Sequence, residues 1–483
     1  MANITDLSLS QIKKELDGNK LSGKEVVLAF KQAYEADQAH KTPLNGYIEF
    51  FDDAEKLAEA SDARRKNNEA RGLEGLPLAI KDNILIQGKI ATCGSSILKD
   101  FRAPYSSTVV ERLKNQGIIP VGRTNMDEFG MGSSCEYSIY GPTRNPMDRN
   151  KTPGGSSGGS ASVVAGKQAP AALGTETGGS VRLPAAFCGI YGLKPSYGTL
   201  SRYGVVAYGS SLDQIGILSR DPDDMALLLE HGVGTDPHDE TSAALDFSGV
   251  YPLKPKNPKG LKIALPEEFM GEGIDEVIKN KVTAFASWFE KQGATVESIK
   301  LPILKSTVAI YYIIAPAEAS SNLTRYDGIR YGFRDEKASS LEDLYIKSRS
   351  QGFGDEVKRR IFIGNYVLSS GYYDAYYKKA MQVRSILKQE IAKVYENYDL
   401  ILSPTSPCLP FNLGAKLDDP LAMYLTDICT TFVNLAQIPS LSVPCGTSEE
   451  GLPIGIQLIG KQFSEINLLS IAKTWHQEEG LKQ

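Results

Sequence analysis

The sequence predicts an α/β fold with a largely parallel or mixed sheet. Short apolar runs typical of buried strands recur along the chain, and amphipathic helix patterns alternate with them. With 483 residues, 41% of them hydrophobic and 23% charged, the chain also has ample material for a large core. A prior of about 150 residues per domain would suggest three domains. Because strand patterns resume after the polar segments 235–258 and 328–358, we instead expect these to be surface excursions from one large domain.

The first predicted element is a helix near the N-terminus. Ser22 and Glu25 have capping-box spacing, and apolar residues follow them on one helical face. We expect residues 1–70 to form a helical segment packed on a core of residues 71–483, the whole making one structural unit. Further along the chain, a helix is expected at 109–117 and another ending at Gln292, with strands at 76–80, 118–122, 260–266, 294–302, 399–404, 439–444 and 453–460.

The segment from Asp355 to about Tyr395 is also expected to be helical. It contains a cluster of tyrosines, for which packing between helices is the favoured interpretation. The cluster comprises Tyr366, Tyr372, Tyr373, Tyr376 and Tyr377.

Charge and composition exclude several classes of protein. The net charge is −5, from 53 Lys and Arg against 58 Asp and Glu. A protein that binds nucleic acid alone usually carries a basic excess, so any such contact is expected through a partner. The six cysteines include no CxxC pair, which disfavours a metal site and favours reduced thiols. Without a signal-peptide pattern or an unbroken apolar span, the chain is expected to be cytoplasmic and not in a membrane.

A segment rich in glycine and serine lies between Gly154 and Ser180. Of its 27 residues, 8 are Gly and 5 are Ser. A flexible linker fits poorly, because apolar stretches lie inside the segment. A phosphate-binding loop fits poorly too, since both the P-loop ending and the GxGxxG spacing are missing. The remaining interpretation is a catalytic loop, in which glycines let the backbone approach a substrate closely.

A serine that ends such a loop is a candidate nucleophile. The N–H groups before Ser180 can point together at a developing oxyanion. The nucleophile needs a base, and none of the four histidines (His40, His231, His238 and His476) lies in a Gly/Ser motif, although a Ser-His-Asp triad stays open. Lys81 follows an apolar strand, and a lysine desolvated at the end of a buried strand can become a base.

Three motifs together resemble the amidase signature family. LPLAIKDNI (76–84), TPGGSSGGSASVVA (152–165) and GTETGGSVRLPAAFCGIYGLKPSYG (174–198) occur in the family's order and at its spacings. The resemblance implies one large α/β domain around a twisted mixed sheet flanked by helices. It makes Ser180 the acyl-forming nucleophile, Ser156 a bridging serine after a cis peptide bond, and Lys81 the base. The oxyanion hole would be the backbone N–H groups of Thr177, Gly178, Gly179 and Ser180.

Two positions depart from the family pattern. Glu176 stands where Asp is usual, and Ser196 stands where Thr is common. Both changes are conservative and lie outside the three catalytic positions. A slight shift of the loop is the effect expected of Glu176.

Within that family, the stretches 311–332, 356–377 and 423–430 resemble the glutamine-hydrolysing subunits of tRNA-dependent amidotransferases. This resemblance implies that Arg360 pairs with the α-carboxylate of glutamine, that Asp427 pairs with its α-ammonium, and that Tyr311 lines the pocket. A guanidinium fork suits a carboxylate, and a carboxylate suits an ammonium. The adjacent Arg359 stays open as the carboxylate ligand.

The same resemblance implies a heterotrimer. A kinase-like B subunit would use ATP and Mg²⁺ to activate Glu on misacylated tRNA, and a small C subunit would clamp the two large ones. No cofactor or metal is expected in this chain, and the partner would bind most of the tRNA. Two other functions stay open: a free-standing amidase acting on small aliphatic or aryl amides, and a non-enzymatic binding protein.

Overall fold

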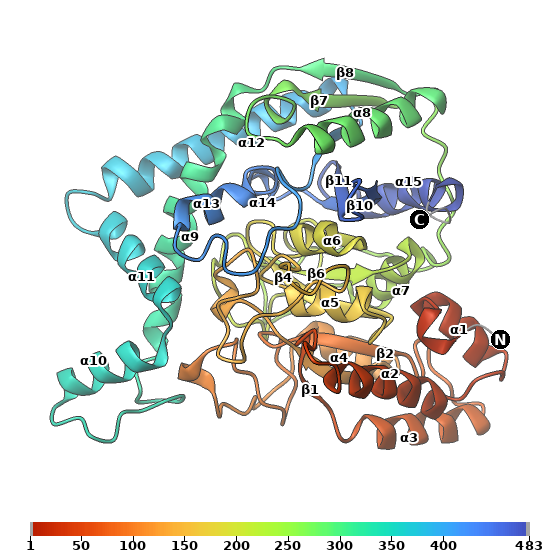
Figure 1. Cartoon of the computed structure of the whole chain (residues 1–483), viewed down its shortest axis with the longest axis horizontal. Helices are drawn as coiled ribbons and strands as arrows, with labels where there is room; N and C mark the ends of the chain where they lie inside the picture. Colours follow the sequence, from red (N-terminus) through yellow and green to blue (C-terminus); the bar gives the residue numbers. More distant parts are fainter. Residues whose placement is uncertain (1–2, 480–483) are drawn as a thin grey trace.

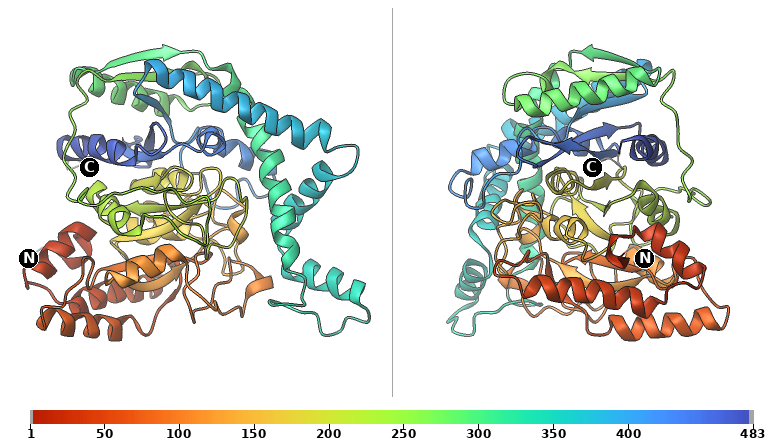
Figure 2. Two further views of the ribbon diagram at one scale, coloured as in Figure 1. Left: turned by 180° about the vertical axis from the view of Figure 1, so that it is seen from behind. Right: turned by 45° about the vertical axis from the view of Figure 1, so that its right-hand side comes forward.

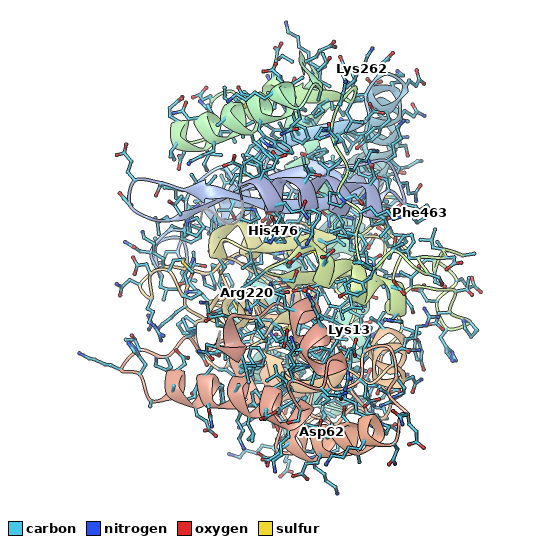
Figure 3. All side chains as sticks on the ribbon, turned by 90° about the vertical axis from the view of Figure 1, so that its right-hand side faces the viewer. Lys13, Asp62, Arg220, Lys262, Phe463 and His476 are labelled. Atoms are coloured by element: carbon cyan, nitrogen blue, oxygen red, sulfur yellow. The ribbon has the colours of Figure 1, made fainter. Side chains whose placement is uncertain are left out.

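A mixed sheet of eleven strands organises the computed structural model, which describes residues 3–479. The strand order is β1-β3-β2-β4-β6-β5-β10-β11-β9-β7-β8. Helices cover both faces of the sheet, as Figure 1 shows. Figure 3 views the stack from the side, with Asp62 of the first helices near one end and Lys262 of β7 near the other. The predicted α/β class with one mixed sheet is confirmed.

All seven predicted strands are present, with bounds shifted by a few residues. They are β2 (Pro77–Lys81), β3 (Ile119–Thr124), β7 (Lys262–Pro266), β8 (Thr295–Ile299), β9 (Leu400–Pro404), β10 (Ser440–Thr447) and β11 (Pro453–Ile459). Four further strands were not predicted: β1 (Tyr47–Phe50), β4 (Ala171–Glu176), β5 (Tyr191–Lys194) and β6 (Gln214–Ser219).

The fifteen α-helices in the described part of the chain connect these strands. They are α1 (Leu9–Asp17), α2 (Gly23–Gln38), α3 (Ala54–Lys66), α4 (Thr108–Asn115), α5 (Gly158–Ala165), α6 (Arg182–Cys188), α7 (Pro222–Gly232), α8 (Glu276–Lys291), α9 (Thr307–Asn322), α10 (Leu341–Gly352), α11 (Asp355–Leu368), α12 (Lys379–Asn397), α13 (Pro420–Tyr424), α14 (Thr431–Ala436) and α15 (Glu465–Glu478). The predicted capping box at α2 is confirmed, because the Ser22 side chain accepts from the Glu25 N–H. Within residues 3–479, no helix is long and apolar enough to cross a membrane.

The core lies on both faces of the sheet, because alternate residues of each strand point to opposite sides. Leu78 and Ile80 of β2 belong to a cluster with α4, α7 and α15, whereas Ala79 between them belongs to a cluster with α5 and α6. The described part of the predicted N-terminal segment, residues 3–70, contributes α1, α2 and α3 and also the edge strand β1, which pairs with β3. Arg220, labelled in Figure 3, donates to the carbonyls of Thr5 and Leu7 and ties the N-terminal segment to this core.

The two predicted surface excursions have different structures. Residues 235–258 contain no helix or strand and lead from α7 toward β7. The other excursion, 328–358, contains α10 and the start of α11. Together α10 and α11 form an arm that extends away from the sheet, seen from two sides in Figures 1 and 2.

Four of the five tyrosines of the cluster are not buried between helices, so that interpretation was wrong for them, whereas Tyr377 is half-buried. Tyr366, Tyr372, Tyr373 and Tyr376 are all exposed, at 40% to 48% of their surface. The helical prediction for this segment is confirmed, with α11, a π-helical turn at Asp374–Lys378 and α12. Helical periodicity says which residues share a face, but it does not say whether another element covers that face.

Candidate active site

The site forms where β2 and β4 end at the same edge of the sheet. The two strands are parallel neighbours, so their carboxyl ends meet. Lys81 is the last residue of β2, and the loop after β4 runs through Thr177 to Ser180. Residues almost a hundred positions apart in the chain are therefore placed together by the sheet.

Lys81 is fully buried and donates to three oxygens. Its Nζ lies 2.8 Å from Ser156 Oγ, 2.8 Å from Ser157 Oγ and 3.2 Å from the carbonyl oxygen of Thr175. Burial disfavours the charged ammonium and lowers the pKa of Lys81 from 10.5 to about 7. Near pH 7 the Lys81 amine is therefore neutral in a large fraction of the molecules, and it can then accept a proton.

The peptide bond before Ser156 is cis, as the family resemblance predicted. Gly155 has no room for a side chain, because an added Cβ would come 2.1 Å from Asp127 Oδ2. The Asp127 carboxylate in turn accepts from the backbone N–H groups of Cys135, Glu136 and Tyr137. The glycine thus lets the chain pass close to a buried carboxylate and brings Ser156 to the lysine.

The loop from Thr177 to Ser180 is held on several sides. Thr177 Oγ1 donates to Asp213 Oδ1 at 2.6 Å, and Thr430 Oγ1 donates to the Gly178 carbonyl at 2.6 Å. Gly179 has a φ of 148°, a conformation that favours glycine. The Ser157 N–H donates to the Ser180 carbonyl at 3.0 Å, which joins the two serine segments. The backbone geometry of the loop is therefore fixed before any substrate binds.

The two departures from the family pattern have structural partners. Glu176 accepts from the N–H groups of Val181 and Arg182 and from the Arg182 side chain. This buried ion pair holds the turn that follows Ser180, and the attraction of Arg182 keeps the pKa of Glu176 low despite its burial. Ser196 accepts from the Phe463 N–H at 2.7 Å.

The structure brings Arg360, Asp427 and Tyr311 together beside this loop. Asp427 accepts from Ser133 Oγ at 3.0 Å and from the Tyr312 hydroxyl at 2.8 Å. The Tyr312 ring also lies 5.3 Å from the Arg360 guanidinium. Tyr311 packs against Gly178, where an added Cβ would come 2.5 Å from its ring. Burial raises the pKa of Asp427 to about 7, so an approaching cation would favour its ionised form.

The neighbouring arginines Arg359 and Arg360 both pair with Glu356, but their side chains differ in burial. The Arg360 side chain is 3% exposed, whereas that of Arg359 is 41% exposed. Arg360 donates to Glu356 at 2.8 Å and to the Tyr208 hydroxyl at 2.7 Å, which uses two of its five N–H donors. The burial of Arg360 beside Tyr208 and Tyr312 favours it over the exposed Arg359 as the candidate carboxylate ligand.

Several residues of the site were not predicted from the sequence. Ser157 is the second hydroxyl on Lys81, Asp213 holds Thr177, and Glu356 holds Arg360. Adjacency to Ser156 could have indicated Ser157, and the spacing of four on a helix could have indicated Glu356. No sequence signal indicates Asp213, because it comes from a loop far along the chain.

The four histidines have other surroundings. His40 bonds within its own turn, His238 stacks on Tyr203, His476 contacts Tyr191, and His231 lies near Gly72. Their positions give no support to a histidine base. Among residues 3–479, no group of three or more His, Cys, Asp or Glu side chains could hold a metal ion.

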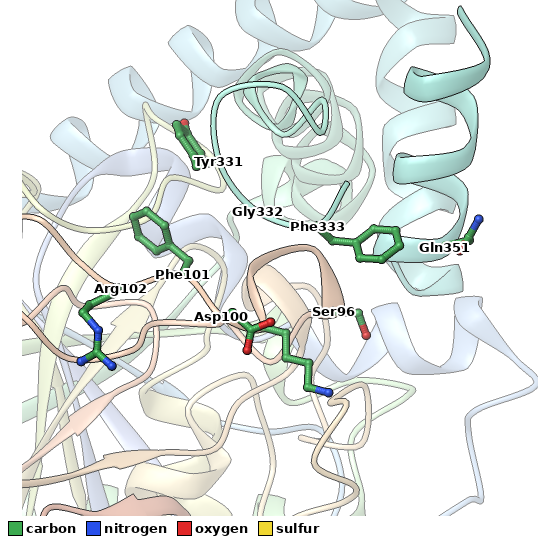
Figure 4. A pocket seen from close by; sticks show the side chains of 9 residues that line it. Ser96, Asp100, Phe101, Arg102, Tyr331, Gly332, Phe333 and Gln351 are labelled. Atoms are coloured by element: carbon green, nitrogen blue, oxygen red, sulfur yellow. The ribbon is translucent and has the colours of Figure 1, made fainter. Parts of the chain in front are cut away.

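A separate cavity of about 630 Å³ lies outside the site, where the arm meets the body. Figure 4 shows it between residues 96–102 and residues 331–333, with Phe101 facing Tyr331. The two rings are 5.6 Å apart. None of the residues predicted for catalysis or substrate binding lines it.

Comparisons with known proteins agree with the fold and cover almost the whole chain. The amidase family model matches residues 25–469. The A subunit of glutamyl-tRNA(Gln) amidotransferase from Treponema denticola is 50% identical over 482 residues, which is 98% of this chain and 99% of that protein. The crystal structure of the A subunit of glutamyl-tRNA(Gln) amidotransferase from Thermotoga maritima has a TM-score of 0.80 and 38% identity, covering 99% of this chain and 96% of that one.

A solved amidase of another kind is also similar. The peptide amidase from Stenotrophomonas maltophilia has a TM-score of 0.79 at 28% identity and covers 97% of this chain and 96% of its own. The family match extends over most of the sequence and includes every residue of the site described above. The chain therefore belongs to the amidase family.

Proposed function

We propose that this chain is the glutamine-hydrolysing subunit of a tRNA-dependent amidotransferase. One observation carries the proposal: a buried guanidinium and a buried carboxylate, those of Arg360 and Asp427, flank the loop that ends at Ser180. Such a pair suits the two charges of a free amino acid. Similarity over nearly full length to proteins named as the A subunit of glutamyl-tRNA(Gln) amidotransferase supports the same substrate.

The proposed chemistry is hydrolysis of the glutamine amide through an acyl-enzyme. Neutral Lys81 accepts the proton of Ser156, which accepts the proton of Ser180 as its Oγ attacks the amide carbon. The carbonyl oxygen becomes an oxyanion held by backbone N–H groups of Thr177, Gly178, Gly179 and Ser180. The proton returns to the departing nitrogen, ammonia leaves, and water then hydrolyses the ester to glutamate and free Ser180.

The proposed binding mode uses both ends of glutamine. Arg360 holds the α-carboxylate with its remaining N–H donors, and Asp427 holds the α-ammonium. Tyr311 lines the pocket beside Gly178. This arrangement directs the side-chain amide toward Ser180.

The proposed setting is a cytoplasmic heterotrimer. A kinase-like B subunit uses ATP and Mg²⁺ to activate Glu on misacylated tRNA(Gln), and the ammonia released here converts it to Gln-tRNA(Gln). A small C subunit holds the two large ones together. The net charge of −5 agrees with tRNA being bound mainly by the partner.

The test is glutaminase activity of the chain alone and with its partners. We expect weak hydrolysis by the isolated chain, a clear gain with the kinase-like and small partners, and loss of both with Ser180→Ala. Full, tRNA-independent activity of the isolated chain would count against the role in a complex. A free-standing amidase is the alternative: a substrate panel in which glutamine is inert and an aliphatic or aryl amide is hydrolysed would favour it.

A further inference from the structure

In the described part of the chain, the buried side chains of Arg360 and Asp427 carry opposite charges but do not pair with each other. Arg360 pairs with Glu356 instead. The Asp427 carboxylate accepts from the hydroxyls of Ser133 and Tyr312. The attraction of Arg360 opposes the rise that burial causes in the pKa of Asp427, so the two charges lie within electrostatic reach. Because buried opposite charges are usually paired, their separation here needs a structural cause.

Tyr312 of α9 contacts both charged groups. Its hydroxyl donates to Asp427 Oδ2 at 2.8 Å, and its ring centre lies 5.3 Å from the Arg360 guanidinium. Burial raises the pKa of Tyr312 well above its usual value, so the hydroxyl stays protonated and remains a donor. A ring face attracts a guanidinium without neutralising its charge. One side chain therefore presents its polar end to the carboxylate and its ring to the cation.

A second tyrosine holds the Tyr312 ring in place. Tyr424, the last residue of α13, stacks on Tyr312 with the ring centres 3.9 Å apart and the ring planes at 18°. Its hydroxyl donates to Glu356 at 2.8 Å, and its own ring centre lies 5.2 Å from the Arg360 guanidinium. Burial raises the pKa of Tyr424 to about 12, so it too is a donor at neutral pH. The stacked pair therefore fills the space beside Arg360 with two rings.

The helices that carry Tyr312 and Arg360 are in direct contact. Pro316 lies one helical turn after Tyr312, and Gly364 lies one turn after Arg360. A Cβ at Gly364 would come 2.0 Å from the Pro316 carbonyl, so α9 and α11 touch through their backbones. Figure 1 shows α9, α11 and α13 at the same side of the molecule. The place of the Tyr312 ring beside Arg360 therefore follows from helix packing, and no substrate is needed to set it.

We propose that Tyr312 is a specificity-determining wedge: it keeps Arg360 and Asp427 from neutralising each other, so that the site selects an amide carrying both a carboxylate and an ammonium. The inference rests on the proposed function, because it concerns the amino acid that this function hydrolyses. It adds the residue that leaves both charges of the empty site available to a zwitterion. An amide without charges would leave both groups unpaired, and a site built to pair with its substrate rejects such an analogue.

Removing the ring should remove the selectivity. In Tyr312→Leu the guanidinium and the carboxylate can approach and pair, and this buried ion pair must then be broken before glutamine binds. We expect the KM for glutamine to rise by about a hundredfold, with a much smaller change in kcat, because the proton relay is untouched. Tyr312→Phe keeps the ring and loses only the hydroxyl on Asp427, so its KM should rise by less than about tenfold. The kcat/KM for butyramide, which carries no charge, should stay unchanged or rise in Tyr312→Leu.

A second substitution separates the wedge from a merely structural role. Glutaramate has the carboxylate and the amide of glutamine but no ammonium, so it uses Arg360 and not Asp427. Tyr312→Leu should raise the KM for glutaramate, because Asp427 then pairs with Arg360. Adding Asp427→Asn should return that KM to within about threefold of the wild type, whereas a second substitution would not repair lost packing. Tyr395→Leu is the matched control and should keep the wild-type KM: Tyr395 packs on the same apolar cluster, and its hydroxyl has no partner among the described residues.

The measurement is steady-state ammonia release by the full chain from each amide, with thermal unfolding of every variant. If Tyr312→Leu folds and keeps the wild-type KM for glutamine, the wedge is wrong while the proposed function stands. If Asp427→Asn does not restore glutaramate in the Tyr312→Leu background, the inferred pairing is wrong and the inference is overturned. If the wild-type chain hydrolyses butyramide but not glutamine, the proposed function is wrong and this inference with it.

A second variant covers the case in which Tyr312→Leu does not fold. Tyr424→Leu removes the ring that stacks on Tyr312 and leaves Tyr312 itself in place. We expect the same pattern at a smaller size: a higher KM for glutamine and for glutaramate, with the glutaramate KM restored by Asp427→Asn. A wild-type KM for both amides in Tyr424→Leu would overturn the inference.

Discussion

Lys81 Nζ lies 2.8 Å from Ser157 Oγ, which is the same distance as from Lys81 Nζ to Ser156 Oγ. The lysine therefore has two adjacent hydroxyl partners, of which only Ser156 is assigned to the relay. Ser157 also donates to the Thr175 carbonyl, so it fixes where the amine sits. We expect Ser157→Ala to lower kcat by about tenfold to a hundredfold, since it removes one buried hydrogen bond from Lys81. Ser157→Thr, which keeps the hydroxyl, should restore part of the rate.

Removing the base should lower kcat more than removing the Ser157 hydroxyl does. Lys81→Met and Ser156→Ala should each lower kcat by about 10²- to 10⁴-fold, the usual contribution of general base catalysis. Lys81→Arg should not rescue the rate, because a guanidinium stays charged at neutral pH. The measurement is steady-state ammonia release. Near wild-type rates in either variant, with the thermal transition unchanged, would contradict the relay.

The pH dependence should show an acid limb with two ionisations. Lys81 works only when deprotonated and Asp427 binds only when ionised, and each has a pKa of about 7 in the free protein. As pH falls through 7, the neutral form of Lys81 and the ionised form of Asp427 are both lost. A plot of log kcat/KM against pH should therefore fall with a slope steeper than one. In Asp427→Asn the slope should approach one. A wild-type profile that is flat between pH 5.5 and about pH 8 would exclude both groups.

The substrate-binding pair should act mainly on KM. Arg360→Lys loses the planar fork, and Asp427→Asn loses the charge that faces the ammonium, so KM for glutamine should rise by about tenfold to a hundredfold. Arg359→Ala is the comparison variant: its side chain also pairs with Glu356 but is 41% exposed, so KM should change much less than in Arg360→Lys. The opposite ranking of the two arginines would make Arg359 the ligand.

Asp213 should act through the oxyanion loop. Its carboxylate accepts from Thr177 Oγ1 and from the N–H groups of Tyr208 and Gly209. Asn offers one acceptor oxygen where Asp offers two, so the loop should loosen in Asp213→Asn. We expect kcat to fall by about tenfold to a hundredfold with little change in KM. Thr177→Val should have the same effect and Thr177→Ser should not; a KM effect in place of kcat would contradict a positioning role.

Much of the fold could be predicted from the sequence, because strands buried on both faces are nearly continuous apolar runs. β2 and β9 are of this kind. β4 was missed because it lies inside a segment whose glycines and serines resemble a loop. The edge strand β1 was missed because four residues carry too little periodicity to distinguish a strand from a turn.

The site was predictable only as far as its motifs reach. The positions of Lys81, Ser156 and Ser180 lie in three local motifs, so their identity comes from short stretches of chain. Asp213 and Tyr208 act from a loop that meets the site only after the sheet has formed, and nothing local marks them. The exposed tyrosines at and after the end of α11 show the same limit, since their exposure depends on what the rest of the chain leaves uncovered.

The burial of Lys81 has a consequence for the product as well as for the base. An ammonium ion formed beside Lys81 would meet the same desolvation that lowers the pKa of the lysine to about 7. We therefore expect ammonia released beside Lys81 to stay uncharged until it leaves the site. Uncharged NH₃ keeps its lone pair, so it is the form that can attack an activated carboxyl group. The desolvation that lowers the pKa of Lys81 therefore also favours the reactive form of the released ammonia.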